Sequence, residues 1–245
     1  MKTNSIKTEF KSENKILKGI LHLPQSENPP LVIGSHGLEG SKDSAKQTAL
    51  AKLLPGAGIA FFRFDHRGCG ESDGNFEIDT SLDTRSTDMI NGLNHALSLN
   101  HTSRRFALFG SSLGGATCIE TWGRLALKNI TPLGMVICAA PVKSITIEKI
   151  PLNGNAHRPA LPLSFFRDNL LFDISAKTAS INNILIFHGD NDKTVPVENG
   201  YNIYNNAKTP KKLIIQKNGD HQMSNDKDQQ DFNREAPAWF KKCFL

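Results

Sequence analysis

Long apolar runs are missing from this 245-residue sequence, and their absence excludes one class of protein. No uninterrupted apolar stretch approaches the ~18 residues that a membrane-spanning helix needs, so we expect no membrane partner. Residues 1–10 contain lysines but no apolar core, so we expect no secretory signal and a cytoplasmic location. An apolar content of 38% and a charged content of 22% indicate a globular chain long enough for one sizeable α/β domain.

Cysteine, tyrosine and tryptophan are also scarce. The four cysteines form no C-x-x-C pair and have no metal-ligand spacing, so we expect free thiols and no metal site; they are Cys69, Cys118, Cys138 and Cys243. The two tyrosines and two tryptophans offer few stacking surfaces, and the net charge of +5 is spread along the chain. We therefore expect no nucleic-acid partner.

Short apolar runs and helical patterns alternate along most of the chain. Two runs predict an N-terminal hairpin, at residues 5–10 and 15–23, and further strands are predicted at 31–35, 59–64, 105–109, 133–139, 183–187 and 212–216. Helices are predicted at 44–54, 82–99, 116–127 and 225–240, the last with a bend or a start near Pro237. This order predicts an α/β fold with an eight-stranded, mostly parallel sheet flanked by helices, formed as a single domain by residues 1–245.

Residues 144–182 interrupt the alternation. The segment is too long for a simple crossover, and its second half has an apolar patch that includes Phe165, Phe166, Leu170 and Phe172. Long insertions in compact domains are often lids or binding elements, so we predict a short lid whose apolar patch forms part of a substrate pocket. The alternative is an ordinary packing helix.

The strongest chemical signal is the G-x-S-x-G pentapeptide at residues 110–114, which lies between a predicted strand and a predicted helix. A sharp turn in this context lifts a serine hydroxyl to the tip of a sheet, and glycines two residues before and after it avoid collisions. Ser112 has glycine at both positions, whereas Ser111 has Phe109 and Leu113. Ser112 is therefore the candidate nucleophile, although the pentapeptide alone also fits a tight turn without a function.

A serine nucleophile needs a base, and the base needs a carboxylate that orients it. The expected chain order is Ser, then Asp or Glu, then His. The loop after the strand at 183–187 offers Asp190 and Asp192, and His221 follows the last predicted strand, where the base is expected. Asp220 is a weaker candidate acid, because adjacent side chains on a loop usually diverge.

Three of the other histidines also bear on the site. His157 lies in the insertion, where it could contact a substrate, but its place in the chain order does not make it the base. His36 and His188 each precede a glycine at a strand end, and there we expect a histidine to bond to nearby backbone groups.

Negative charge that develops on the substrate oxygen needs backbone N–H donors. One is expected from the residue after the nucleophile, Leu113, and the second from the loop after the third strand, where Leu38 is the natural donor. The alternative for this second loop is a glycine-rich turn without a role. The loop at residues 65–72 is interpreted as scaffold braced by Asp65 and Arg67, because its Gly-x-Gly lacks the rest of a phosphate-binding or dinucleotide-binding motif.

Five segments in this order resemble the α/β-hydrolase fold family over nearly the whole chain: residues 36–40, 65–72, 110–114, 188–196 and 219–221. Among its members the chain looks most like small carboxylesterases of the cinnamoyl/feruloyl esterase and serine-aminopeptidase-like groups. The loop at 188–196 is similar to the family's H-G-x-x-D-x-x-V-P acid loop, which favours Asp192 as the acid and leaves Asp190 as a turn residue.

The resemblance implies a set of roles and a reaction. Ser112 would be the nucleophile, His221 the base, Asp192 the acid, and Leu38 and Leu113 the oxyanion donors, with no metal or organic cofactor. The expected function is hydrolysis of a small acyl ester through an acyl-enzyme. Alternatives that keep these residues are a peptidase or amidase, a thioesterase and a lipase-like enzyme, and a different class of alternative is a non-catalytic binding protein of the hydrolase fold.

Overall fold

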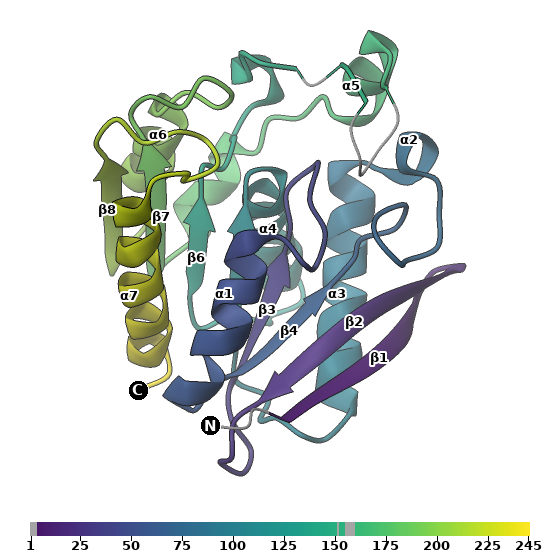
Figure 1. The fold of residues 1–245 in the computed structure, drawn as a ribbon, viewed down its shortest axis with the longest axis vertical. Coiled ribbons are helices and arrows are strands. Elements are labelled where there is room, and N and C mark those ends of the chain that lie inside the picture. The colour runs from purple at the N-terminus through teal and green to yellow at the C-terminus, as the bar shows by residue number, and fades with distance from the viewer. Residues whose placement is uncertain (1–3, 151, 155–159) are drawn as a thin grey trace.

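The computed structural model describes residues 4–150, 152–154 and 160–245, and these residues form one eight-stranded sheet in the order β1-β2-β4-β3-β5-β6-β7-β8 (Figure 1). Its strands are β1 (Asn4–Ser12), β2 (Lys15–Leu23), β3 (Leu31–Ser35), β4 (Ala60–Phe64), β5 (Phe106–Ser111), β6 (Met135–Cys138), β7 (Ile184–Gly189) and β8 (Lys211–Gln216). The hairpin strand β2 pairs antiparallel with β1 and β4, and the other neighbours pair parallel. The predicted fold, an eight-stranded and mostly parallel sheet, is confirmed.

Helices cover both faces of the sheet. The α-helices are α1 (Ala45–Leu53), α2 (Phe76–Asp79), α3 (Leu82–Ser98), α4 (Leu113–Ala126), α5 (Leu163–Asn169), α6 (Glu198–Asn206) and α7 (Asp226–Cys243). Helices α1 and α7 pack on one face, and α3, α4 and α6 pack on the other (Figure 1). Alternate residues of strands β3 to β7 belong to opposite cores: in β3, Val32 faces α1 and α7, while Leu31 and Ile33 face the opposite layer. No helix in the described ranges is long and apolar enough to cross a membrane.

The expected start of a helix near Pro237 needs correction. Helix α7 begins at Asp226, where the Asn225 side chain accepts a hydrogen bond from the Asp228 N–H, and it continues through Pro237 to Cys243. Phe232, Ala236 and Phe240 of this helix are buried, so packing on both sides of the proline offsets the backbone hydrogen bond that proline cannot donate.

The short helices α2 and α6 were not predicted. In α6 only Ile203 is a buried large apolar residue among the described side chains, and Gly200 lies in the helix interior. The helical apolar pattern is correspondingly weak there.

The order of the strands creates the site. The chain passes from β3 outward to β4 and then returns to β5 on the other side of β3. The loops that follow β3 and β5 therefore diverge, which leaves a crevice at the carboxyl ends of these strands. Ser112 follows β5, Leu38 follows β3, Asp192 follows β7 and His221 follows β8, so the fold brings the predicted site residues to one edge of the sheet.

The insertion lies above this edge. Its described parts include the 3-10 helices η2 (Ser144–Thr146) and η3 (Ser175–Ser180) and helix α5, which stands beyond the carboxyl ends of the strands (Figure 1). An antiparallel bridge between Lys143 and Asp173 joins its beginning to its later part. Its action as a lid stays a prediction, and His157 lies outside the described residues.

Candidate active site

The turn between β5 and α4 is strained in the way that a nucleophile elbow requires. Ser112 has φ 55° and ψ −125°, a backbone conformation that non-glycine residues rarely adopt. A Cβ at Gly110 would lie 2.2 Å from the Gly114 carbonyl oxygen, and a Cβ at Gly114 would lie 2.2 Å from the Ser35 carbonyl oxygen. Both glycines of the motif are therefore needed for close packing of backbone against backbone, as the sequence suggested.

Three side chains from different loops form a continuous hydrogen-bonded chain. The Ser112 Oγ lies 2.9 Å from the His221 Nε2, and the His221 Nδ1 lies 2.7 Å from the Asp192 Oδ2. The Ser112 and His221 side chains are 109 residues apart in sequence and meet because β5 and β8 end at the same edge of the sheet. The structure thus brings together the serine, histidine and aspartate that the sequence singled out.

The environment of Asp192 keeps this carboxylate charged. Its side chain is fully buried, and burial alone would raise its pKa. The hydrogen bond from His221 and the backbone N–H groups of Thr194 and Val195, which donate to Oδ1 at 2.8 and 2.9 Å, outweigh burial and hold the pKa of Asp192 below its ordinary value. One carboxylate oxygen is thus fixed by the backbone and the other is directed at the imidazole.

The rival acids point elsewhere. The Asp190 Oδ1 accepts a hydrogen bond from the Asn218 N–H at 2.6 Å, and the Asp220 Oδ1 accepts one from the Ser224 N–H at 2.9 Å. The Asp190 carboxylate thus joins the loop after β7 to the turn after β8, and the Asp220 carboxylate stabilises its own turn, a common use of aspartate in loops.

The two histidines at strand ends bond to backbone groups, as expected. The His188 Nε2 lies 2.8 Å from the Val195 carbonyl oxygen, and the His36 Nδ1 lies 2.8 Å from the Gly37 carbonyl oxygen. Both rings are almost completely buried.

Backbone N–H groups are placed beside the serine. Leu113 is the first residue of α4, so its N–H has no acceptor one turn earlier within the helix. The loop that carries Leu38 passes close over the elbow, since a Cβ at Gly37 would lie 3.5 Å from the Ser112 Cβ. Leu38, Leu113 and Ser112 all line one cavity, and the role of the two N–H groups as oxyanion donors stays a prediction.

The cavity in front of Ser112 has a volume of about 900 Å³. Its walls are largely apolar and include Ile145, Ile147, Phe166, Leu170 and Phe172 from the insertion. Phe165 does not line this cavity. Its ring is buried and packs against Phe76 of α2 at 5.9 Å between centroids, because Phe165 lies on the side of α5 that faces the protein.

The sequence did not single out the cavity wall formed by Ser44, Lys46 and Gln47, at the start of α1. These polar residues carry no motif. Their place in the site depends on the path of the loop after β3.

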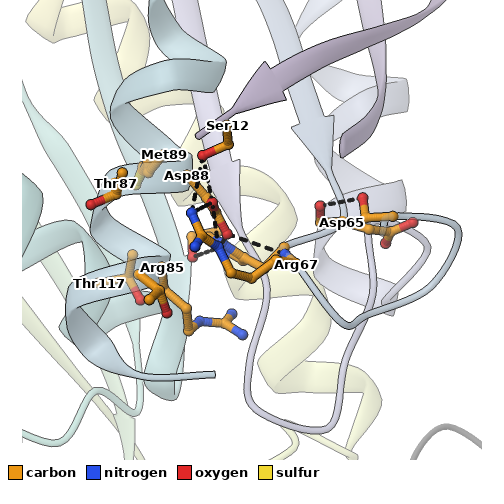
Figure 2. Close-up of polar contacts among 12 residues, drawn as sticks. Ser12, Asp65, Arg67, Arg85, Thr87, Asp88, Met89 and Thr117 are labelled. Carbon is orange, nitrogen blue, oxygen red and sulfur yellow. Dashed lines mark hydrogen bonds and ion pairs between the residues drawn. The ribbon is translucent and has the colours of Figure 1, made fainter. Parts of the chain in front are cut away.

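The loop after β4 is braced by buried charge, as predicted from Asp65 and Arg67. The Arg67 guanidinium donates to Asp88 of α3 at 2.6 Å (Figure 2). The Asp65 carboxylate accepts from the Lys42 Nζ at 2.9 Å. Burial favours the neutral acid, yet hydrogen bonds from His66 and Arg67 lower the pKa of Asp88 to about 2.

Comparison with known proteins places this geometry in a family. A family model described as serine aminopeptidase, S33, matches residues 26–164. The chain belongs to this family. A second model, described as the prolyl oligopeptidase family, matches residues 153–245, the part that contains Asp192 and His221. Both are serine hydrolase families, so the expected resemblance to α/β-hydrolases is confirmed.

Relatives and solved structures agree with this assignment. The uncharacterized protein YfhR of Escherichia coli K12 is 28% identical over 204 residues, covering 81% of this chain and 67% of that protein. Protein phosphatase methylesterase 1 of Schizosaccharomyces pombe is 31% identical over 125 residues, covering 50% of this chain and 36% of that protein. The structure of Est1E from Butyrivibrio proteoclasticus with ferulic acid bound has a TM-score of 0.81 at 20% identity, covering 97% of this chain and 99% of that chain. At this identity the structural match shows the α/β-hydrolase fold.

Proposed function

We propose that the protein is a serine hydrolase that cleaves carboxyl esters through an acyl-enzyme. The observation that carries the proposal is the hydrogen-bonded chain from Asp192 through His221 to Ser112, which opens onto a mostly apolar cavity. A serine hydroxyl is a weak nucleophile near neutral pH, and a histidine oriented by a carboxylate is the arrangement that activates it.

Acylation follows from the positions of the three side chains. The Ser112 Oγ attacks the ester carbonyl carbon while the His221 Nε2 takes the hydroxyl proton, and the carbonyl electron pair moves to the oxygen. Asp192 accepts from the His221 Nδ1–H and stabilises the imidazolium that forms. The backbone N–H groups of Leu38 and Leu113 are the proposed donors to the oxyanion, and each such donor typically contributes about 10²–10³ in rate.

Collapse of the tetrahedral intermediate expels the alcohol, which takes the proton from His221. Water then occupies the place of the alcohol, and His221 removes a proton from it as it attacks the acyl carbon. A second tetrahedral intermediate releases the carboxylic acid and returns the proton to Ser112. No step needs a group beyond these residues and water.

The shape of the cavity supports an apolar acyl or aryl group as the part of the substrate next to the carbonyl. Phe166, Leu170 and Phe172 supply apolar surface from the insertion. The ferulic acid held by Est1E is an aromatic acid, and this likeness of fold supports inclusion of aromatic acyl esters among the substrates to be tested.

The test is the initial rate on p-nitrophenyl acetate, butyrate and octanoate, measured for the wild type and for Ser112→Ala. We expect the wild type to hydrolyse these esters and Ser112→Ala to lose the activity. The preference among the three acyl chain lengths will show how long a chain the acyl site accepts. Equal rates in the two proteins would refute the proposal, because the activity would then not depend on Ser112.

Peptide hydrolysis is the second candidate, and the descriptions of both matching family models favour it. Amides need protonation of a poor leaving group, which places a greater demand on the order of His221 than esters do. Matched ester and p-nitroanilide substrates with the same acyl group separate the two. An ester-to-amide ratio of kcat/KM above about 10³ supports the esterase, and a ratio near one supports the peptidase.

A further inference from the structure

Arg85 of α3 is a fully buried cation that has no carboxylate partner among the described residues. Its Nη2 donates to the backbone carbonyl oxygen of His36, while its Nε and Nη1 have no hydrogen-bond partner in the described part of the chain. Asp88, one turn further along α3, accepts instead from Arg67 and Ser12 (Figure 2). Arginine is rarely buried unless it is paired, so this placement requires a reason.

The groups that surround the guanidinium do not neutralise it. The Cys69 and Cys118 thiols face Arg85, and burial raises the pKa of Cys69 to about 11 and that of Cys118 further still. The rings of His36 and His66 are neutral, because burial, followed by the charge of Arg85, lowers the pKa of each. The Asp88 carboxylate attracts Arg85 through space, but it is bonded to Arg67, so the positive charge of Arg85 has no ion-pair partner of its own among the described residues. This charge lies directly behind the loop that follows β3.

The hydrogen bond from Arg85 to the His36 carbonyl oxygen leads to the proposed oxyanion site. The backbone N–H of His66 donates to the Nε2 of the His36 ring at 3.2 Å, so this ring nitrogen is an acceptor without a proton. The proton of the neutral His36 ring is therefore assigned to Nδ1. This Nδ1–H donates to the Gly37 carbonyl oxygen at 2.8 Å. In a trans peptide the N–H points opposite to the C=O, so fixing the Gly37 carbonyl fixes the direction of the Leu38 N–H.

We propose that Arg85 is a positioning residue of the oxyanion site. It anchors the His36 carbonyl, beside the His36 ring that orients the Gly37–Leu38 peptide, and its charge favours the negative oxygen of the tetrahedral intermediate. Fixed charges and dipoles directed at developing charge act strongly where water is excluded. The proposal rests on the proposed serine hydrolase function, since an oxyanion forms only if Ser112 adds to a carbonyl.

The test compares Arg85→Met, which removes the charge and the donors at similar volume, with Arg85→Lys, which keeps the charge. Arg67→Met is the matched control, because Arg67 is also buried but bonds to Asp88 and Glu13 and not to the loop after β3. Thermal unfolding of each variant gives the fraction that is folded at the assay temperature, and kcat is calculated from the concentration of folded enzyme. Should Arg85→Met fail to fold, Arg85→Gln replaces it, since glutamine keeps a donor without the charge.

We expect Arg85→Met to lower kcat on p-nitrophenyl butyrate by about 10–100-fold, with KM changed less than threefold, because the contact matters in the transition state. Arg85→Lys should recover at least one third of the wild-type kcat. Arg67→Met should lower the unfolding temperature and leave the kcat of the folded enzyme within threefold of the wild type.

A tetrahedral adduct supplies a readout that a purely structural role would not change. An alkyl trifluoromethyl ketone accepts the Ser112 Oγ at its carbonyl carbon, its carbonyl pair becomes an oxyanion, and the serine proton passes to His221. Its affinity should fall in Arg85→Met by the same factor as kcat/KM, while affinity for the matching secondary alcohol, which forms no oxyanion, stays unchanged.

Two results overturn the proposal, and they are distinguishable. A wild-type kcat in folded Arg85→Met, or an equal loss of affinity for the ketone and the alcohol, refutes the role of Arg85 and leaves the serine hydrolase function intact. Absence of Ser112-dependent turnover in the wild type refutes the proposed function, and the role of Arg85 with it.

Discussion

Replacing Asp192 with asparagine is the sharpest single perturbation of the proposed site. The Asp192 Oδ1 accepts from the Thr194 and Val195 N–H groups at 2.8 and 2.9 Å, and its Oδ2 lies 2.7 Å from the His221 Nδ1. In Asp192→Asn the amide oxygen keeps the two backbone bonds, so the NH₂ group faces the His221 Nδ1. That nitrogen must then accept, and the imidazole proton moves to Nε2, where it points at Ser112.

An imidazole with its proton on Nε2 cannot take the proton of the serine hydroxyl. We expect kcat/KM for a p-nitrophenyl ester to fall by about 10⁴, because the geometry is kept and the tautomer is wrong. This factor corresponds to about 5 kcal/mol of activation free energy. The free energy of unfolding should change by only about 1 kcal/mol, since the number of hydrogen bonds is preserved.

The assay is the steady-state rate with urea unfolding measured in parallel, and Asp190→Asn is the matched control from the same loop. The Asp190 carboxylate bonds to the Asn218 N–H and not to His221, so this control should retain activity within about threefold. The reasoning is refuted if Asp192→Asn keeps more than a tenth of the wild-type activity, or if Asp190→Asn loses as much as Asp192→Asn.

Three further predictions follow from the contacts. Gly114→Ala should abolish activity and destabilise the fold, because its Cβ would lie 2.2 Å from the Ser35 carbonyl oxygen; a circular-dichroism melt indistinguishable from wild type would contradict this. Ionised Asp88 stabilises the folded protein, because its pKa is about 2 in the folded state and about 4 in the unfolded chain. This contribution to the free energy of unfolding, on the order of 2 kcal/mol, is complete above pH 4 and is lost as the pH falls towards 2. Urea unfolding at pH 5, 4 and 3 should show this loss in the wild type and a flatter profile in Asp88→Asn. Phe166→Ala should lower kcat/KM for the octanoate ester more than for the acetate ester, because Phe166 lines the cavity. Phe165→Ala, which removes a buried ring, should mainly lower the unfolding temperature. The opposite pattern would show that Phe165, and not Phe166, contacts the acyl chain.

Much of the fold was predictable because the sheet has a simple local signature. Strands such as β3 and β7 are buried over their whole length, and they read in the sequence as short apolar runs between turn residues. The order of the site residues was predictable for a similar reason, since a serine between two correctly spaced glycines is followed by an aspartate loop and a histidine after later strands. Chain order left Asp190 and Asp192 both open, and the resemblance of the loop to the family's acid loop favoured Asp192.

The features that were missed depend on tertiary contacts that have no local pattern. Phe165 and Phe166 are adjacent and chemically identical, and only the position of α2 decides which ring is covered by Phe76 and which faces the cavity. Arg85 occupies an ordinary helical position, and its burial is set by a loop 49 residues earlier in the chain. Helix α6 has one large buried anchor, Ile203, so its periodicity was too weak to identify it.

The most direct test of the central claim is to trap the acyl-enzyme. The protein is mixed with p-nitrophenyl butyrate for a few milliseconds, quenched in acid, weighed by intact-mass spectrometry and mapped by peptide digestion. The account predicts one butyryl group per chain, located on Ser112, with its formation greatly slowed in His221→Ala. Rapid turnover accompanied by a butyryl group on another residue would contradict the assignment of Ser112 as the nucleophile.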